Sequence, residues 1–236
     1  MPPFSCTPLG EQALLIQFEQ KIDAAVLRHI MAMEQLIQTH LPKGIRELIP
    51  AYASLAVLFE DEHWTYRKLA EAMLDLGKLI PKAIRHLPKG RTHEIPVQYG
   101  GRNGPDLTTV AQKLKLTEDE IVERHIRRTY LVYMLGFLPG FVYLGKPDPA
   151  LHLPRREKPR LKVPAGSIAI AAEQTGIYTL ESPGGWHIIG RTTQNLFNRP
   201  QASNKKKKPE EPENRSPSLL RRGDWVKFVA LSQATT

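Results

Sequence analysis

The sequence changes character at Tyr130, and this change limits the possible folds more than any other feature. From there on it is rich in β-branched, aromatic and glycine residues, and short apolar runs alternate with turns that contain Gly and Pro. Runs of this kind are typical of an antiparallel β-domain, which must close into a barrel or form a sandwich to bury its apolar faces. The predicted strands are residues 130–135, 167–171, 176–180, 186–189 and 225–231.

The first part of the chain has the alternating strand and helix patterns of an α/β domain. Leu14, Ile16 and Phe18 occupy every second position, which predicts a strand over 13–18. Asp23 can cap the following helix, whose apolar residues recur every three or four positions. The order predicted after the strand is a helix at 23–40, strands at 45–52 and 54–60, and a helix at 65–79.

The next predicted strand, 94–99, has two interpretations. It either completes a ferredoxin-like βαββαβ layer or opens a second domain. The polar segment 86–92, with sequence HLPKGRT, contains Pro and Gly and is the predicted domain boundary. We therefore expect an α+β protein with a ferredoxin-like α/β domain at 1–90 and a β-domain at 91–236.

Two short helices are predicted before the β-rich part. Asp106 can cap the first, over 107–114, and Thr117 with Glu120 forms a capping box that opens the second. His125 lies near the end of that second helix. We interpret it as a capped or surface histidine in preference to a functional titrating group.

The formal charge of +9 suggests nucleic-acid binding at first sight. Four of the positive charges are Lys205 to Lys208, in a low-complexity stretch, and the others are scattered among acidic residues. We therefore expect no nucleic-acid partner. Segment 199–217 has no apolar periodicity and is predicted to be a mobile surface loop, with docking to an acidic partner as the less favoured alternative.

The sequence predicts a cytoplasmic protein without a membrane partner. No stretch approaches the roughly 18 apolar residues of a membrane helix, and the N-terminus does not resemble a signal peptide. Cys6 is the single cysteine, which rules out an intramolecular disulfide, and its segment is expected to be flexible. The histidines occur in no metal-binding motif, so no metal site is predicted.

Three clusters in the second domain carry residues that a plain β-core does not require. The first, 136–145, places aromatic residues between Gly and Pro, as in packed turns or a ligand wall. The second, 154–166, contains Arg155, Arg156 and Arg160, whose guanidinium groups suit carboxylates and phosphates, although solvated arginines are the commoner case.

The third cluster, 173–192, is the densest. Its glycines at 176, 184, 185 and 190 are expected to allow positive φ and close backbone approach to a ligand. The sequence contains no GxxxxGK[ST] phosphate loop. Ser182 lacks a GxSxG context, and Cys6 has no nearby base, so both are weak nucleophile candidates. The pattern favours a polar binding pocket over a self-sufficient catalytic centre.

These clusters resemble the family of carboxyltransferase domain subdomains C and D, also called allophanate hydrolase subunit 1 or PxpB/KipI. The resemblance runs from about Leu9 to Leu231. It is carried by PLGEQALLIQF, IPAYASLAVLF, YGGRNGPDL, LGFLPGFVYLG, VPAGSIAIAAEQTGIY and SPGGWHIIGRT. It implies a small α/β first domain and a cyclophilin-like β-barrel as the second.

The resemblance also implies a function that this chain does not perform alone. Family members form an ATP-dependent 5-oxoprolinase, which converts 5-oxo-L-proline to L-glutamate with release of ADP and phosphate. The implied partners are a PxpC/KipA-like protein, resembling allophanate hydrolase subunit 2, and a PxpA-like (LamB/YcsF) protein. The complex uses ATP, with its site not assigned to this chain. The alternatives are inhibition of a sporulation sensor histidine kinase and a carboxyltransferase module of the urea carboxylase type.

The resemblance further implies which residues form the pocket. Gln174 and Tyr178 would hydrogen-bond a lactam, Arg155 or Arg191 would bind a carboxylate or phosphate, and glycine amides would stabilise an oxyanion. Gln174, Tyr178 and Arg191 are thus the catalytic candidates. The complete set of implied substrate or nucleotide pocket residues is Phe137, Pro139, Gly140, Phe141, Arg155, Pro164, Ala165, Gly166, Gln174, Thr175, Gly176, Tyr178, Ser182, Pro183, Gly184, Gly185, Trp186 and Arg191.

Overall fold

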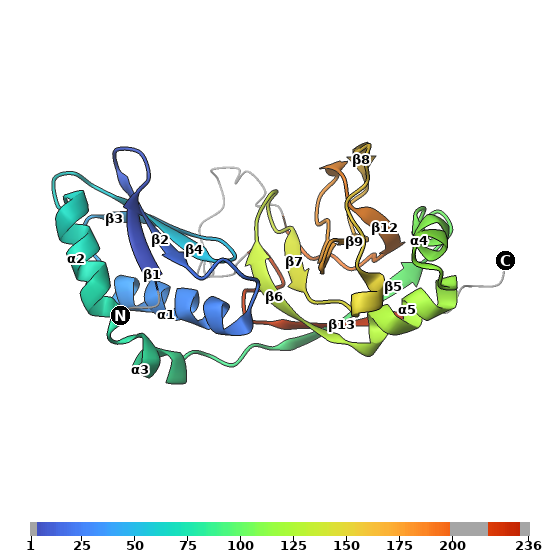
Figure 1. Ribbon diagram of the computed structural model, residues 1–236, viewed down its shortest axis with the longest axis horizontal. Helices are drawn as coiled ribbons and strands as arrows, with labels where there is room; N and C mark the ends of the chain where they lie inside the picture. Colours follow the sequence, from blue (N-terminus) through green and yellow to red (C-terminus); the bar gives the residue numbers. More distant parts are fainter. Residues whose placement is uncertain (1–3, 199–216, 232–236) are drawn as a thin grey trace, which may run out of the picture. The chain divides into compact units, whose positions relative to one another are not determined.

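The computed structural model describes residues 4–198 and 217–231 (Figure 1). It divides into two compact units, Met1–Lys89 and Gly90–Thr236, and each is described by itself. Most of segment 199–217, the predicted mobile loop, lies outside the described residues, so this prediction stays a prediction.

The first unit is built on an antiparallel sheet with strand order β1-β2-β4-β3. Leu14, Ile16 and Phe18 of β2 are buried, as their period of two predicts. The predicted strands and their limits are confirmed to within two residues, and β1 is additional. The bounds are β1 Phe4–Pro8, β2 Ala13–Phe18, β3 Ile45–Pro50 and β4 Ser54–Phe59.

Two capped helices pack on this sheet. The side chain of Asp23 accepts a hydrogen bond from Ala25 N and begins α1, Ala24–His40, whose apolar stripe is buried against the sheet. Thr65 caps α2, Tyr66–Gly77, in the same way. A short third helix, α3 Ile80–Arg85, follows at once.

The arrangement of the sheet is a variant of the ferredoxin-like layer. β1 lies antiparallel beside β2, at the edge where the last strand of a βαββαβ unit would otherwise lie. Cys6 is therefore half-buried in a strand, and the expectation of a flexible segment was wrong. Burial raises the pKa of its thiol to about 11, so this cysteine is a poor nucleophile at neutral pH.

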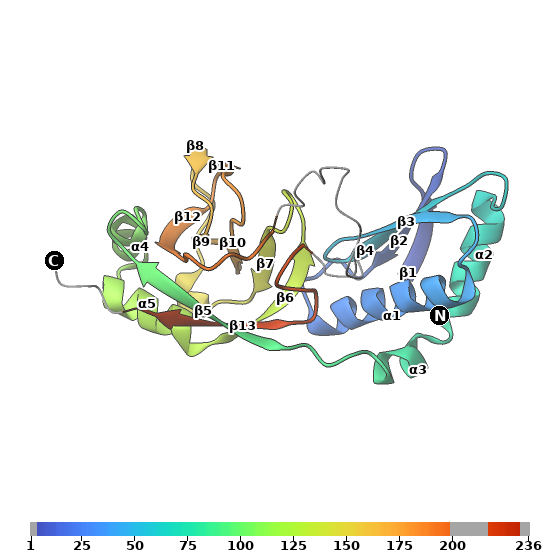
Figure 2. The ribbon, with the colours of Figure 1, turned by 180° about the vertical axis from the view of Figure 1, so that it is seen from behind.

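The second unit is a closed barrel with strand order β10-β7-β6-β13-β5-β12-β9, in which β9 pairs with β10. Its first and last strands, β5 and β13, are parallel neighbours (Figure 2). The strand predicted at 94–99 therefore opens the second unit and does not complete the ferredoxin-like layer of the first. The bounds are β5 Thr92–Tyr99, β6 Thr129–Leu135, β7 Val142–Gly145, β9 Ser167–Ala171, β10 Gln174–Ile177, β12 His187–Arg191 and β13 Trp225–Ala230.

The remaining elements surround the barrel. Helices α4, Leu107–Leu114, and α5, Glu118–Arg127, lie where the sequence predicts them, and Thr117 and Glu120 form the predicted capping box. A separate ribbon pairs β8, Arg160–Val163, with β11, Ser182–Gly184. A short 3-10 turn, η1, covers Pro149–Leu151. β8 alternates charged and apolar residues over only four positions, with Leu161 exposed, and β11 consists of Ser, Pro and Gly; neither gives a strong strand signal in the sequence.

His125 is inside the core of the second unit, so its interpretation as a capped or surface residue was wrong. Its ring stacks on Phe228 with a centroid separation of 4.7 Å. Its Nδ1 lies 2.7 Å from the Tyr99 hydroxyl, and its Nε2 lies 2.9 Å from Thr175 Oγ1. Burial lowers the pKa of His125 to about 3, so the ring is neutral at physiological pH.

None of the helices among residues 4–198 and 217–231 is long and apolar enough to cross a membrane. The predicted absence of a metal site stays a prediction.

Candidate functional site

An open pocket of about 360 Å³ lies where the predicted residues Ala165, Gly166 and Arg191 meet. Arg191 is the last residue of β12, and Ala165 and Gly166 form the turn that leads into β9. The other wall is a polar segment that directly follows Arg191. The lining is Ala165, Gly166, Thr179, Arg191, Thr192, Thr193, Gln194, Asn195 and Leu196.

Gly166 holds the two walls of the pocket together. Its N–H donates to Tyr178 O at 2.6 Å, and its carbonyl accepts from Thr192 N at 2.9 Å. Its φ of +82° is accessible to glycine, and a Cβ at this position would collide with the Thr192 carbonyl. Arg191 is fixed to the same turn, because its Nε donates to Ala165 O at 2.8 Å.

A substitution at Gly166 is therefore expected to damage the pocket. We expect Gly166→Ala to lower the free energy of unfolding by about 1–3 kcal/mol, since it combines backbone strain with displacement of Thr192. Gly185→Ala is the matched control, because its new Cβ meets only ordinary contacts with Pro159, and a change within about 0.5 kcal/mol is expected. Urea denaturation of both variants measures the difference, and equal stabilities would contradict this role of Gly166.

Much of the polar lining is already hydrogen bonded within the chain. Thr179 Oγ1 donates to Pro139 O at 2.8 Å, and Thr192 Oγ1 accepts from Gln194 N at 3.1 Å. Asn195 uses both ends of its amide within its own turn. The side-chain oxygen of Gln194, in contrast, is buried and has no hydrogen-bond partner in the described part of the chain.

A second group of predicted residues forms an aromatic cluster beside this pocket. The Phe141 ring lies 4.8 Å from Tyr178 and 5.7 Å from Trp186, both edge-on, and 4.6 Å from Tyr143. Ala169 and Ala171, which are on the side of β9 opposite the barrel interior, belong to the same cluster. The cluster is therefore a small core outside the barrel.

The aromatic cluster connects to the polar pocket through the chain itself. Tyr178 belongs to the cluster, and the next residue, Thr179, lines the pocket. Burial raises the pKa of the Tyr178 hydroxyl, so it stays protonated at neutral pH. Phe141, Tyr178 and Trp186 are each at most 5% exposed, so their contribution in this structure is to shape and support the pocket wall.

The glycines of the third cluster serve packing, which corrects our expectation of positive φ there. A Cβ on Gly184 would collide with the Tyr178 hydroxyl, and one on Gly176 would lie 3.0 Å from the Trp186 ring. Gly176, Gly184, Gly185 and Gly190 all have ordinary φ values. At Gly176, Gly184 and Gly190 a neighbouring group leaves no room for a side chain, so packing within the chain explains these glycines without a ligand.

Loop 136–140 carries a strained, exposed aromatic residue. Phe137 has a φ of +69° and is 67% exposed, with its ring edge-on to Phe141 at 5.8 Å. Gly140 also has positive φ, and a Cβ there would meet the ring of Phe197. The loop is held to the pocket rim by the bond from Thr179 to Pro139. Three predicted residues, Phe137, Pro139 and Gly140, are thus near the rim rather than in the lining.

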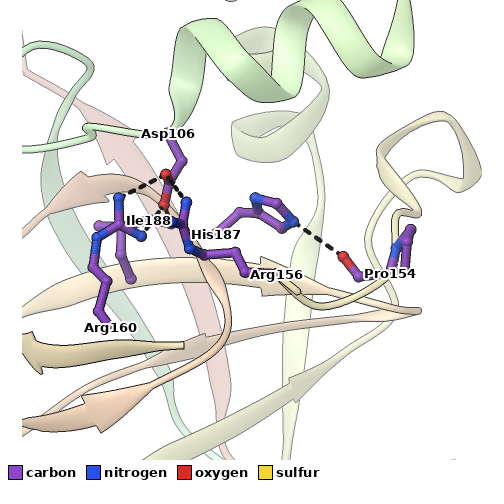
Figure 3. Close-up of polar contacts among 6 residues, drawn as sticks. All are labelled: Asp106, Pro154, Arg156, Arg160, His187 and Ile188. Atoms are coloured by element: carbon purple, nitrogen blue, oxygen red, sulfur yellow. Dashed lines mark hydrogen bonds and ion pairs between the residues drawn. The ribbon is translucent and has the colours of Figure 1, made fainter. Parts of the chain in front are cut away.

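The arginines of the second cluster have different environments. Arg156 Nη1 lies 2.6 Å from Asp106 Oδ1, and Arg160 makes two hydrogen bonds of 2.7 Å to the same carboxylate (Figure 3). The main-chain N–H of Ile188 donates to Asp106 at 2.7 Å. Arg156 and Arg160 therefore share the Asp106 carboxylate in a structural ion network, and the terminal nitrogens that make these bonds are not available to the anionic ligand that we expected for them.

Asp106 corrects a second expectation. It occupies the N-cap position of α4 but makes no capping hydrogen bond, because its side chain is directed to the two arginines. Beside this network, His187 Nε2 is bonded to Pro154 O at 3.0 Å (Figure 3). Arg155 is exposed, and its charge acts on Tyr143 and Tyr178, so it lies near the aromatic cluster.

The other predicted residues are dispersed. Thr175 is fully buried inside the barrel, where its hydroxyl group hydrogen-bonds with His125 and donates to Ala169 O. Contrary to our expectation, it does not line the pocket. Gln174 and Gly176 lie on the same strand as Thr175, and a Cβ on Gly176 would point at the Trp186 ring.

Two more of the predicted residues, Ser182 and Pro183, are in the ribbon strand β11, and the Ser182 hydroxyl donates to the Pro183 carbonyl. Pro164 precedes the Ala165 turn and accepts from Ser167 Oγ.

Sequence reasoning missed the wall formed by residues 193–196. The available signal was the polar run Thr193-Gln194-Asn195 directly after the GRT motif, ending in buried Leu196. A polar run fixed between a strand end and a buried leucine is well placed to present side chains to a ligand.

Residues 4–206 match the family described as carboxyltransferase domain, subdomain C and D. The chain belongs to this family. This carboxyltransferase-domain protein is 36% identical over 234 residues to the 5-oxoprolinase B subunit of Bacillus subtilis (strain 168), covering 95% of this chain and 92% of the relative. It is 38% identical over 225 residues to the 5-oxoprolinase B subunit of Escherichia coli O157:H7, covering 95% and 94%.

The fold of this carboxyltransferase-domain protein also has a solved counterpart. The Kluyveromyces lactis urea carboxylase matches it with a TM-score of 0.73 at 15% identity, covering 97% of this chain and 22% of that one. At this identity the likeness shows the fold alone. It agrees with the fold class predicted from the sequence.

Proposed function

We propose that this chain is the B subunit of an ATP-dependent 5-oxoprolinase and acts in complex with two partner subunits. The observation that carries the proposal is the identity of 36–38% to proteins named as the B subunit of 5-oxoprolinase, over more than nine-tenths of each chain. The proposed partners are the PxpC/KipA-like and PxpA-like proteins that the resemblance implies.

The proposed reaction requires more groups than this chain offers. Opening the lactam of 5-oxoproline to glutamate consumes one water, and hydrolysis of ATP to ADP and phosphate consumes another. The sequence has no GxxxxGK[ST] loop for the nucleotide. His125 is buried, has a pKa of about 3 and hydrogen-bonds with Tyr99 and Thr175 in the core, so it is a poor general base. In the part of the chain that the structure describes, the pocket lining has hydroxyl groups but no carboxylate, histidine or lysine to serve as a base, which fits one part of a composite site.

The proposal is tested by reconstitution from three purified proteins. We expect glutamate to form from 5-oxoproline and ATP when all three are present, and the rate to fall to background when this chain is left out. Adding the chain back should restore the rate in proportion to its concentration until the partners are saturated. Glutamate formation that is unchanged without this chain would contradict the proposed function.

A further inference from the structure

The pocket at Arg191 has a specific set of unused hydrogen-bonding groups. An arginine has five N–H donors, and Arg191 is shown to use only Nε, which leaves its two terminal nitrogens available among the described residues. The Gln194 side-chain oxygen is buried and unpaired within the described chain, so a ligand reaches it when the side chain turns toward the pocket that this residue lines. The exposed Thr193 hydroxyl is also available among the described residues. Thr179, Thr192 and Asn195 already make hydrogen bonds within the chain, so the groups left for a ligand are the Arg191 cation, the Thr193 hydroxyl and the unpaired Gln194 oxygen.

These groups define the ligand that would satisfy them. A planar guanidinium with two free nitrogens suits a carboxylate, which it can bind with two parallel hydrogen bonds. A buried acceptor without a partner is unfavourable until a donor reaches it. The ligand should therefore combine a carboxylate with an N–H group a short distance away.

We infer that this pocket binds the 5-oxoproline substrate, with the carboxylate on the Arg191 guanidinium and the lactam N–H donating to the side-chain oxygen of Gln194, whose side chain turns toward the ligand on binding. The inference rests on the proposed function and adds to it the position and orientation of the substrate. A pocket of about 360 Å³ is at the small end of ligand sites, which suits a five-membered ring. The lactam carbonyl, where the chemistry occurs, is then free for groups from the partner subunits.

The lining argues against the other anion of the reaction, a nucleotide phosphate. Arg191 is the one cationic side chain among the described residues of the lining, whereas phosphates commonly bind several cations or a row of main-chain N–H groups. The main-chain N–H of Gln194, which could have been part of such a row, already donates to Thr192 Oγ1.

The test measures steady-state kinetics of the reconstituted three-protein assembly with variants of this chain. Arg191→Lys and Gln194→Leu are each expected to raise the KM for 5-oxoproline by about 10- to 100-fold, the loss expected for a charge-assisted bond or a buried acceptor. The KM for ATP should be unchanged. Arg102→Lys and Gln112→Leu, at exposed positions of the same unit outside the lining, are the matched controls.

Two analogues examine the contacts separately as competitive inhibitors. Pyroglutaminol lacks the carboxylate, and 3-oxocyclopentanecarboxylate lacks the N–H. In the unmodified assembly both should bind more weakly than 5-oxoproline. The analogue without the N–H should bind Gln194→Leu about as well as the unmodified assembly, because it never makes that contact. The analogue without the carboxylate should lose less affinity in Arg191→Lys than 5-oxoproline does, because lysine keeps the charge but not the two parallel hydrogen bonds.

The outcomes separate the inference from the proposed function. A raised KM for ATP with an unchanged KM for 5-oxoproline would overturn the inference and leave the function standing. Unchanged KM values for both ATP and 5-oxoproline would likewise overturn the inference and leave the function standing. If the unmodified assembly forms no glutamate, the proposed function fails. The pocket is then tested by NMR titration of this chain with 5-oxoproline: a shift of the Gln194 side-chain amide supports binding there, and unchanged spectra overturn it.

Discussion

Replacing Asp106 by alanine is expected to lower the free energy of unfolding of the second unit by about 3–5 kcal/mol. Asp106 is 2% exposed and forms ion pairs with both Arg156 and Arg160, which are themselves only about a quarter exposed. Its removal leaves two guanidinium groups and the Ile188 N–H without their acceptor. It also releases segment 154–160 from the start of α4, because the two arginines are its polar attachment to that helix (Figure 3).

The measurement is urea denaturation in a Trp64→Phe background. Two of the three tryptophans, Trp186 and Trp225, are in the second unit, so their fluorescence then reports that unit. Glu181→Ala is the matched control: it breaks the exposed ion pair with Lys162, for which a change below about 1 kcal/mol is expected. A change in Asp106→Ala as small as in this control would show that the network contributes little to stability.

Acid should weaken the same network. Burial acts to raise the pKa of Asp106, but the hydrogen bonds from Arg160 and Ile188 and the two arginine charges outweigh it, and the pKa is lowered. A folded-state pKa below the unfolded value means that the unfolded state binds more protons. The stabilisation is therefore complete above the unfolded pKa of about 3.9 and is lost as the pH falls further.

The sequence predicts well those elements whose physical causes are local. The helix α1 begins at a capping Asp23 and has a clear apolar stripe, and Thr117 with Glu120 forms a capping box. Strand β1 was not predictable in the same way. Its run FSCTP is only five residues long and ends in proline, and it is ordered by pairing with β2 and by the hydrogen bond from Tyr66 to Cys6 O. Such pairing depends on residues far along the chain.

The candidate site shows the same division between local and distant causes. Gly166 and Arg191 belong to motifs of the family resemblance, and the structure brings them together in one pocket. The ion pair of Arg160 with Asp106 joins residues 54 positions apart, and the hydrogen bond from His125 to Thr175 joins residues 50 positions apart. No local pattern distinguishes an arginine paired across such a separation from one available to a ligand.

His125 is expected to have the second large effect on stability, because both of its ring nitrogens make hydrogen bonds when the ring is neutral. The Thr175 hydroxyl donates its one hydrogen to Ala169 O at 3.0 Å, so it must accept from His125 Nε2–H. His125 Nδ1 then carries the lone pair that accepts from the Tyr99 hydroxyl. A second proton on the ring would face the Tyr99 oxygen, and its charge would lie in an apolar core.

Acidification is therefore expected to destabilise the second unit through His125. Its folded-state pKa of about 3 lies below the unfolded value of about 6.5, so the unfolded state binds the additional proton between these values. The contribution is complete above about pH 6.5 and declines as the pH falls toward about 3. The slope approaches about 1.4 kcal/mol per pH unit, for a total of several kcal/mol.

His125→Phe isolates this contribution. It keeps an aromatic ring against Phe228 but cannot be protonated, and it leaves the Tyr99 hydroxyl without its acceptor. At pH 7 we expect it to be less stable than the unmodified protein by about 1–3 kcal/mol. On lowering the pH toward 4 this difference should shrink and then reverse, because only the unmodified protein retains the histidine that protonates on unfolding.

Tyr99→Phe is the companion variant, since it removes the hydroxyl but keeps the titrating ring. It should be less stable at pH 7 and keep the steep decline of stability with acid. Urea denaturation at several pH values, in the Trp64→Phe background, compares the three proteins. Because the carboxylates are common to all three, including Asp106, their titration cancels in the differences. A constant difference between His125→Phe and the unmodified protein from pH 7 to 4 would contradict the burial of a neutral histidine as the source of the acid sensitivity.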